Sequence, residues 1–131
     1  MEEEQVINTI QLDDPAFKFS PTEPIMAGAV REDGEYLVRL WDVDSVNQVG
    51  DIAVPGEVLD IAFSPDGKLL SVATFGRPTN DSESAATIYD MSTQELVYTL
   101  DLNLENNDYP GTVAFTPDGG HLAVGTNGEI D

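Results

Sequence analysis

The chain has 131 residues, with 25 Asp and Glu against 5 Lys and Arg, so its formal net charge is −20 at pH 7. Such a charge repels DNA, RNA and anionic membrane surfaces, and the composition therefore excludes nucleic acid and membranes as partners. The absence of cysteine excludes disulfides and zinc-thiolate sites. The N-terminus, Met-Glu-Glu-Glu, lacks the basic and apolar regions of a secretion signal, so we expect a cytoplasmic protein.

The acidic residues are dispersed along the chain rather than gathered in a tail. Two interpretations are open: a charged surface that resists self-association, or adaptation to high salt. A hydrophobic content of 40% argues against a disordered chain.

One short element occurs three times, and it is the strongest signal in the sequence. Its copies are Phe19-Ser20-Pro21, Phe63-Ser64-Pro65-Asp66-Gly67 and Phe115-Thr116-Pro117-Asp118-Gly119. The phenylalanines lie 44 and 52 residues apart. Strand-like segments repeated every 40–50 residues or so are typical of the blades of a β-propeller.

Strand-like segments fill the sequence between the copies, and we name them a to d in the order of one blade. The motif Pro-Asp-Gly that follows strand a is typical of a turn, because Pro presets φ and Gly supplies positive φ. The expected strands are a at 58–63, b at 24–30, 69–75 and 121–126, c at 36–42 and 86–90, and d at 48–54 and 96–102. The sequence therefore predicts an all-β chain made of four-stranded antiparallel blades.

The alignment of the repeats also predicts how the chain is divided. Residues 5–12 align with 95–102, so we expect an orphan outer strand d. Blade 1 then covers 13–56, blade 2 covers 57–109, and 110–131 form an incomplete blade 3, about two and three-quarter blades in one partial propeller. The chain is either part of a longer propeller or a short protein that builds a ring from several chains.

These motifs resemble the WD40 repeat, in which a Trp-Asp pair ends strand c. Leu40-Trp41-Asp42 carries the pair in the first repeat, and the second has Tyr89-Asp90 instead. The Gly-His pair common in such repeats is absent. The resemblance implies a protein-interaction scaffold, and the orphan strand would complete the last blade of a ring. The expected structural positions are Phe19, Phe63, Phe115, Trp41, Asp42, Tyr89 and Asp90.

Two groups among these structural positions, the phenylalanines and the aspartates, carry specific expectations. We expect the three phenylalanines to be buried near the a–b turn. We interpret Asp42 and Asp90 as turn residues.

Candidates for catalysis or metal binding are few. His121 is the one histidine, and it aligns with Leu69 at the start of strand b, where we expect a half-buried residue. The acidic segment 101–108 lacks the spacing of an EF-hand loop. We therefore predict a non-catalytic protein without cofactor or metal. The alternatives are a self-assembling ring and part of a propeller enzyme of the lactonase or dehydrogenase type.

Two insertions predict where a partner binds. They lie at 76–85, between strands b and c, and at 103–110, between strands d and a. In an up-and-down blade these connections share one edge, and binding residues gather on loops of a rigid scaffold. Tyr109 is a candidate anchor. The candidates for contact with a protein partner are Arg77, Asn80, Asp81, Asn107, Asp108 and Tyr109. The alternative is that the two insertions have no binding role and are merely tolerated, which would explain the same loop lengths.

Overall fold

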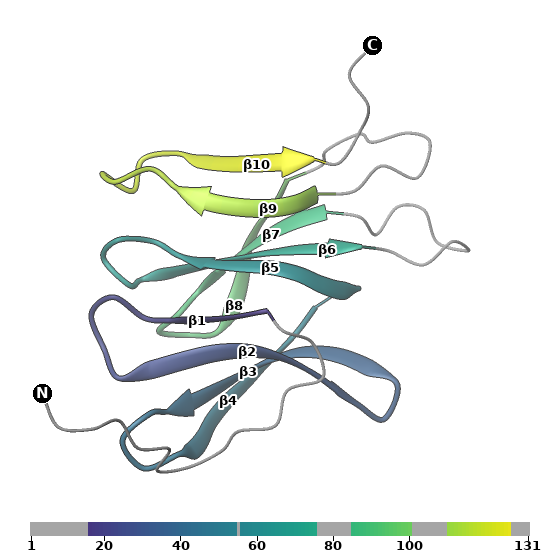
Figure 1. The fold of residues 1–131 in the computed structure, drawn as a ribbon, viewed down its shortest axis with the longest axis vertical. Helices are drawn as coiled ribbons and strands as arrows, with labels where there is room; N and C mark the ends of the chain where they lie inside the picture. The colour runs from purple at the N-terminus through teal and green to yellow at the C-terminus, as the bar shows by residue number, and fades with distance from the viewer. Residues whose placement is uncertain (1–15, 55, 76–84, 101–109, 127–131) are drawn as a thin grey trace, which may run out of the picture.

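The computed structural model describes residues 16–54, 56–75, 85–100 and 110–126. Three antiparallel sheets fill these ranges, in the orders β1-β2-β3-β4, β5-β6-β7-β8 and β9-β10 (Figure 1). The strands are β1 (Phe17–Phe19), β2 (Ile25–Glu32), β3 (Glu35–Asp42), β4 (Asn47–Ala53), β5 (Glu57–Phe63), β6 (Leu69–Phe75), β7 (Ala85–Asp90), β8 (Glu95–Leu100), β9 (Pro110–Phe115) and β10 (Leu122–Thr126). The predicted all-β fold with four-stranded antiparallel sheets is confirmed.

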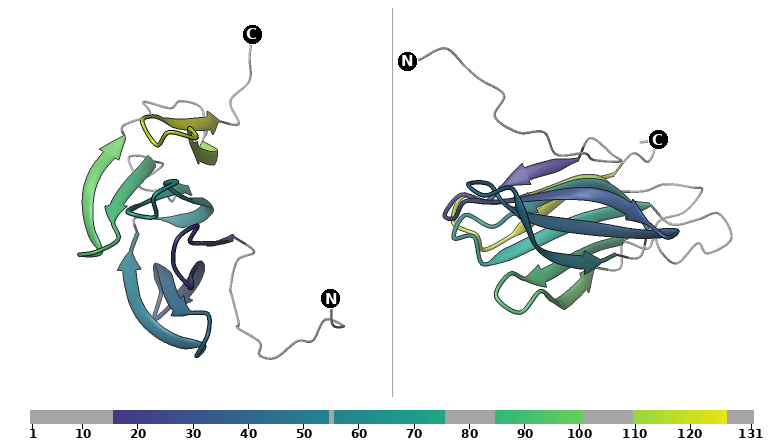
Figure 2. Two further views of the ribbon diagram at one scale, coloured as in Figure 1. Left: turned by 90° about the vertical axis from the view of Figure 1, so that its left-hand side faces the viewer. Right: turned by 90° about the horizontal axis from the view of Figure 1, so that it is seen from below.

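The three sheets pack face to face in chain order. The a strands β1, β5 and β9 lie along one side of the molecule, and the d strands β4 and β8 lie along the other (Figure 2). Contacts between β1 and β5 and between β5 and β9 join successive sheets at their inner strands. The second sheet, β5–β8, is therefore covered on both faces.

The a–b turns of the second and third sheets have the same hydrogen bonds. Ser64 Oγ donates to Asp66 Oδ1 over 2.6 Å, and Thr116 Oγ1 donates to Asp118 Oδ1 over 2.6 Å. Gly67 and Gly119 both adopt φ of +75°. The repeated sequence thus folds into a repeated turn, because the acid accepts from the hydroxyl and glycine tolerates the left-handed backbone.

The c–d turns of the first and second sheets are equivalent as well. Asp42 Oδ1 accepts from the Asp44 N–H, and Asp90 Oδ1 accepts from the Ser92 N–H. Four residues after each aspartate the backbone is left-handed, with φ of 60° at Val46 and 62° at Gln94. Asp42 and Asp90 therefore act as turn-stabilising residues, in the way that the sequence indicates.

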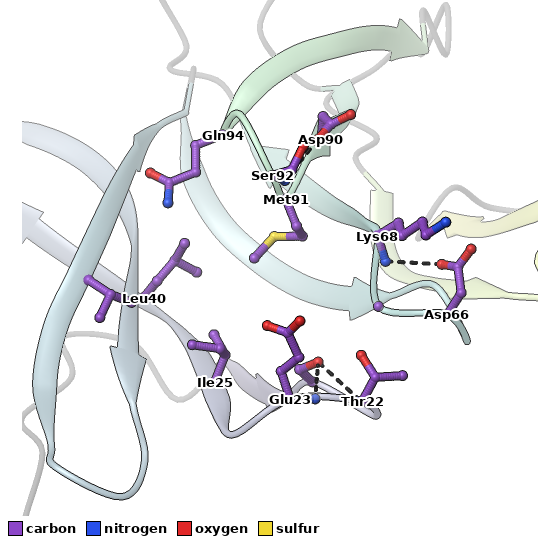
Figure 3. Close-up of a pocket in the computed structure, with 13 residues that line it drawn as sticks. Thr22, Glu23, Ile25, Leu40, Asp66, Lys68, Asp90, Met91, Ser92 and Gln94 are labelled. Carbon is purple, nitrogen blue, oxygen red and sulfur yellow. Dashed lines mark hydrogen bonds between the residues drawn. The ribbon is translucent and has the colours of Figure 1, made fainter.

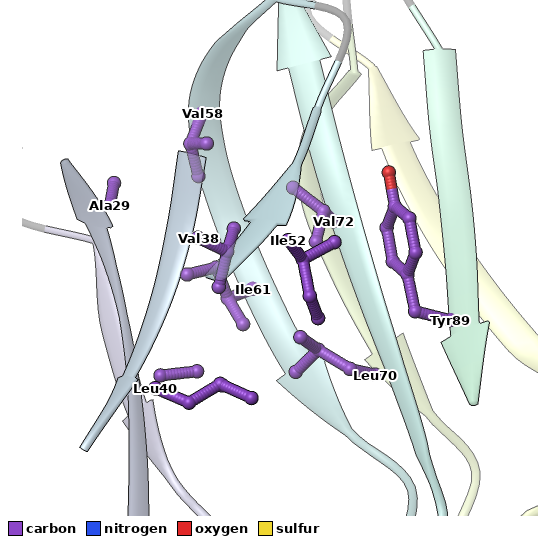
Figure 4. Packing of buried hydrophobic residues seen from close by; sticks show 10 residues of the cluster. Ala29, Val38, Leu40, Ile52, Val58, Ile61, Leu70, Val72 and Tyr89 are labelled. Carbon is purple, nitrogen blue, oxygen red and sulfur yellow. The ribbon is translucent and has the colours of Figure 1, made fainter. Parts of the chain in front are cut away.

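A continuous apolar core fills the space between the first and second sheets (Figure 4). Val38, Leu40 and Ile52 of the first sheet face Ile61 and Leu70 of the second. Full burial of each such side chain stabilises the fold by roughly 1.5–3 kcal/mol. Alternation along β3 places Val38 and Leu40 on the same face of the first sheet.

The core between the second and third sheets is built from smaller side chains. Ala62, Ala73 and Ala86 of the second sheet pack with Val113 of β9, and Leu122 of β10 lies beside them. Small residues on one face and branched residues on the other allow the sheets to approach closely.

The tryptophan and tyrosine of the WD40-like motif have equivalent places. Trp41 pairs with Met26 of β2, and Tyr89 pairs with Leu70 of β6. Both aromatic side chains are buried, at 5% and 4% exposure. Tyr89 packs in the core between the sheets, whereas Trp41 lies on the opposite face of the first sheet, with Met26.

The expectation that all three repeat phenylalanines are buried is wrong. Phe19, Phe63 and Phe115 each end an a strand, so they occupy the same place in their sheets. Phe63 packs on the first sheet and Phe115 on the second, and both are half-buried. Phe19 is 57% exposed, because no described sheet precedes the first one. A phenylalanine at this position depends on the preceding sheet for its burial.

Candidate functional site

The six loop residues proposed for partner binding, Arg77, Asn80, Asp81, Asn107, Asp108 and Tyr109, lie outside the described residues. The strand ends to which the two insertions attach can be placed. Thr74 at the end of β6 pairs with Ala85, and Ala86 pairs with Leu100 at the end of β8. These ends lie at one edge of the second sheet.

A cleft of about 540 Å³ lies at the opposite edge, between the first and second sheets (Figure 3). It is formed by the a–b turns of both sheets, by the c–d turn of the second sheet, and by strands β3 and β4. The lining residues are Ser20, Thr22, Glu23, Ile25, Leu40, Val49, Asp66, Gly67, Lys68, Asp90, Met91, Ser92 and Gln94. This volume is within the usual range for ligand sites, about 300–1,000 Å³.

Apolar side chains form the floor of the cleft. Leu40 belongs to the core between the sheets and is 1% exposed. Ile25 and Met91 pack against the same core and are partly buried, and Val49 is exposed on β4. The cleft is therefore an opening onto the apolar core rather than a gap between polar turns.

Charged side chains form the rim. Hydrogen bonds from the Ser64 hydroxyl and the Lys68 N–H lower the pKa of Asp66. Hydrogen bonds from the Ser92 hydroxyl and N–H lower the pKa of Asp90. Both carboxyls are therefore ionised at neutral pH. With Glu23, the lining has three acidic residues against one basic residue, Lys68, whose side chain points away from the cleft (Figure 3).

Two glycines beside the cleft lie where the first and second sheets approach each other closely. A Cβ on Gly67 would overlap the hydroxyl of Thr22, and a Cβ on Gly50 would lie 2.5 Å from Gln94 Oε1. Thr22 and Gly50 belong to the first sheet and its turns, whereas Gly67 and Gln94 belong to turns of the second. The missing side chains let the two sheets touch through these turn residues, with the cleft lined by the same turns.

A separate polar network joins the inner strands of all three sheets. Lys18 Nζ donates to Asp60 Oδ1 over 3.1 Å and to the Ile61 carbonyl over 2.8 Å. Asp60 Oδ2 accepts from Thr112 Oγ1 over 2.8 Å and from the Val113 N–H over 3.0 Å. Burial raises the pKa of Asp60, but hydrogen bonds from Val113, Thr112 and Lys18 lower it below the ordinary value of 3.8. This network holds the sheets in place and does not line the cleft.

His121 differs from expectation in its burial. The backbone of His121 is placed like that of Leu69. The His121 N–H and carbonyl bond to Thr116, and the Leu69 N–H and carbonyl bond to Ser64 in the same way. The histidine side chain is exposed, since the third sheet has only β9 and β10 among the described strands. Within the described ranges no group of three or more His, Cys, Asp or Glu residues is placed to hold a metal ion. No helix in those ranges is long and apolar enough to cross a membrane.

Comparison with solved structures identifies the fold. A β-propeller domain of the Myceliophteria thermophila protein Swd1 matches 91% of the chain with a TM-score of 0.70 at 14% identity. A chain of the mitotic checkpoint complex matches 86% with a TM-score of 0.67 at 16% identity. The chain has the fold of WD40-type β-propeller blades. It spans 34% and 33% of those two chains.

Sequence comparison points in the same direction. The human echinoderm microtubule-associated protein-like 2 is 29% identical over 110 residues, and its rat counterpart is 28% identical over 110. Both alignments cover 83% of this chain, and the chain spans 15% of the length of these relatives. No protein-family model matches the sequence. The predicted resemblance to WD40 repeats is thus supported by relatives as well as by the fold.

Proposed function

We propose that the chain is a non-catalytic scaffold segment that binds a protein partner. The observation that carries this proposal is the stack of WD40-type blades, a fold whose relatives serve as protein-interaction scaffolds. The rigid sheets hold their connecting loops in fixed positions, and such loops are where binding residues concentrate. The acidic surface favours a partner with a basic patch, chiefly through faster association.

The partner-binding surface that we propose is the edge that carries the two insertions. Tyr109 would be an aromatic anchor, and Arg77 would pair with an acidic group on the partner. The strand ends that flank the insertions support this assignment, because the pairs Thr74–Ala85 and Ala86–Leu100 lie at one edge of the second sheet.

Affinity capture followed by calorimetry tests the proposal. Partners captured by the immobilised chain from cells that express it are purified, and each Kd is measured with variants of both edges. We expect Tyr109→Ala to weaken binding by more than about 1 kcal/mol, or roughly fivefold in Kd. Asp44→Ala and Thr93→Ala on the opposite edge serve as controls. Weaker binding by the controls, with Tyr109→Ala unchanged, would place the partner on the other edge.

Self-assembly is a second candidate, and two open sheet faces favour it. Phe17 and Phe19 are exposed on the first sheet, and their ring centroids lie 6.2 Å apart in an edge-to-face arrangement. Ala114 and Ala123 are exposed on the third sheet, at positions equivalent to Ala62 and Ser71 in the second. Light scattering coupled to size exclusion distinguishes the candidates, since a monomeric mass across micromolar concentrations would eliminate self-assembly.

A further inference from the structure

We propose that the cleft between the first and second sheets binds an extended segment of a protein partner by accepting a long aliphatic side chain with a positively charged end, lysine or arginine. The site lies at the edge opposite the strand ends to which the two insertions attach. It would be a second binding site, separate from the loop edge of the proposed function. The lining residues named above all belong to the described part of the chain.

The apolar floor fits the stem of such a side chain. Ile25 and Leu40 come from the first sheet, and Met91 comes from the c–d turn of the second (Figure 3). Lysine and arginine bury their methylene stems along apolar surfaces while their charged ends stay hydrated. Methionine adapts to the shape of a bound group, because its unbranched side chain has three rotatable bonds.

The position of Glu23 fits the charged end. Its carboxylate projects into the cleft towards Met91, from the a–b turn of the first sheet (Figure 3). Within the described ranges Glu23 has no ion pair. A cation that enters along Ile25 would meet this carboxylate without having to displace an existing partner.

Charge complementarity excludes the other occupants. Three acidic residues, Glu23, Asp66 and Asp90, line the cleft against one basic residue, Lys68, so phosphate, carboxylate and nucleic acid ligands are repelled. An uncharged apolar side chain would fill the floor but would leave Glu23 desolvated without a partner. A cationic side chain on an apolar stem satisfies both parts of the cleft.

The cleft is preformed, which favours binding. Near the cleft Gly67 lies against Thr22, and Gly50 lies against Gln94. These close approaches set the separation of the two sheets, because neither glycine has a side chain that would hold the sheets further apart. A preformed site loses less conformational entropy on binding than one that must close around its ligand.

Methionine methyl NMR provides a direct test. The chain has three methionines, of which Met91 lines the cleft and Met26 lies in a buried cluster with Val30 and Trp41. The full chain with ¹³C-methyl methionine is titrated with the peptide acetyl-Gly-Ala-Arg-Ala-Gly-amide. The matched probe replaces arginine with citrulline, which has the same shape and no charge. We expect a saturable shift of the Met91 methyl resonance with arginine, at least tenfold weaker binding of citrulline, and an unmoved Met26 resonance.

Two isosteric variants separate the local carboxylate from the general acidic field. Glu23→Gln removes the charge inside the cleft, and Glu35→Gln removes the same charge from an exposed position at the start of β3. We expect Glu23→Gln to weaken binding of the arginine peptide about tenfold, whereas Glu35→Gln changes the Kd by less than twofold.

Three outcomes would overturn the proposal. They are an unmoved Met91 resonance, equal binding of the arginine and citrulline peptides, and equal weakening by the two variants. A Tyr109→Ala variant should bind the peptide as the parent chain does, because Tyr109 is not among the residues that line the cleft. The result is thus independent of whether a partner binds the insertions.

Discussion

Lys18 and Asp60 form an ion pair that links the inner strands of neighbouring sheets, with Nζ 3.1 Å from Oδ1. The second oxygen of the same carboxylate accepts hydrogen bonds from Thr112 and Val113 of the next sheet. One carboxylate in the central sheet therefore contacts both of its neighbours. Hydrogen bonds to a charged group contribute more than neutral ones, about 1.5–3 kcal/mol each.

Replacement of this carboxylate should remove a pH-dependent part of the stability. The folded-state pKa of Asp60 is lowered, so its contribution is complete above the ordinary value of 3.8 and is lost as the pH falls through the lower folded value. We expect Asp60→Asn to lower the free energy of unfolding at pH 7 by roughly 1–3 kcal/mol. It should also flatten the decline below pH 4. Urea denaturation between pH 7 and pH 3 measures both effects.

The control for Asp60 is Asp44, an exposed aspartate in the c–d turn of the first sheet. Asp44→Asn removes the same charge from a solvated position, where such changes usually shift stability by less than about 0.5 kcal/mol. Equal losses from Asp60→Asn and Asp44→Asn would contradict a role for the three-sheet network.

Ser71→Ala should stabilise the chain. Ser71 is fully buried in β6, and its Oγ has no hydrogen-bond partner in the described part of the chain. The equivalent residue is Ala27 in the first sheet and Ala123 in the third. An unsatisfied buried hydroxyl costs about 1–3 kcal/mol, so its removal should raise the free energy of unfolding by about 1 kcal/mol.

Thermal and urea unfolding of Ser71→Ala and Ser71→Val measure this gain. Valine also removes the hydroxyl but adds a methyl group at a tightly packed position, and overpacking usually costs 1–3 kcal/mol or so. Stabilisation by alanine alone would identify the hydroxyl as the cause. A destabilised alanine variant would mean that Oγ has a partner.

The two phenylalanines at equivalent strand ends should differ in their energetic contributions. We expect Phe63→Ala to cost about 2 kcal/mol or more, because Phe63 packs against the core between the first two sheets. Phe19→Ala should cost less than about 0.5 kcal/mol, because most of its ring is already in water. Chemical denaturation of a monomeric sample gives both values. A cost for Phe19 similar to that for Phe63 would show that this face is covered in solution.

Added salt should raise the stability. The net charge of −20 produces repulsion within the chain that is screened over a Debye length of about 8–10 Å near 0.1–0.15 M salt. The melting temperature should therefore rise most steeply below that range. An adaptation to high salt predicts a further rise at molar concentrations of potassium chloride. A melting temperature that stays flat from low to molar salt would contradict both expectations.

The repeated turns could be predicted from the sequence because their cause is local. Gly67 and Gly119 each follow a Pro-Asp pair. A residue with a hydroxyl side chain lies three positions before each glycine, at Ser64 and Thr116. The hydrogen bonds that define these turns join residues at most five positions apart. Such short-range contacts do not depend on neighbouring sheets.

The exposure of Phe19 and the cleft could not be predicted in the same way. Both depend on what lies beside a strand in space, and the alignment of repeats treats every blade as if it had two neighbours. Two signals were present all the same. Gly50 interrupts strand d where the second repeat has Tyr98, and Asp60 interrupts the apolar strand a. Each breaks the repeat at a point where the sheets meet.

The two open faces of the stack also restrict the symmetry of any assembly made through them. Phe17 and Phe19 lie on the face of the first sheet that corresponds to the face by which the second sheet packs on the first. Ala114 and Ala123 lie on the face of the third sheet that corresponds to the face by which the second sheet packs on the third. Because these faces are different surfaces, contact between them is heterologous and runs head to tail. A two-fold dimer cannot form in this way. Successive copies would either close into a ring or continue as an open helical filament, according to the rotation between one copy and the next.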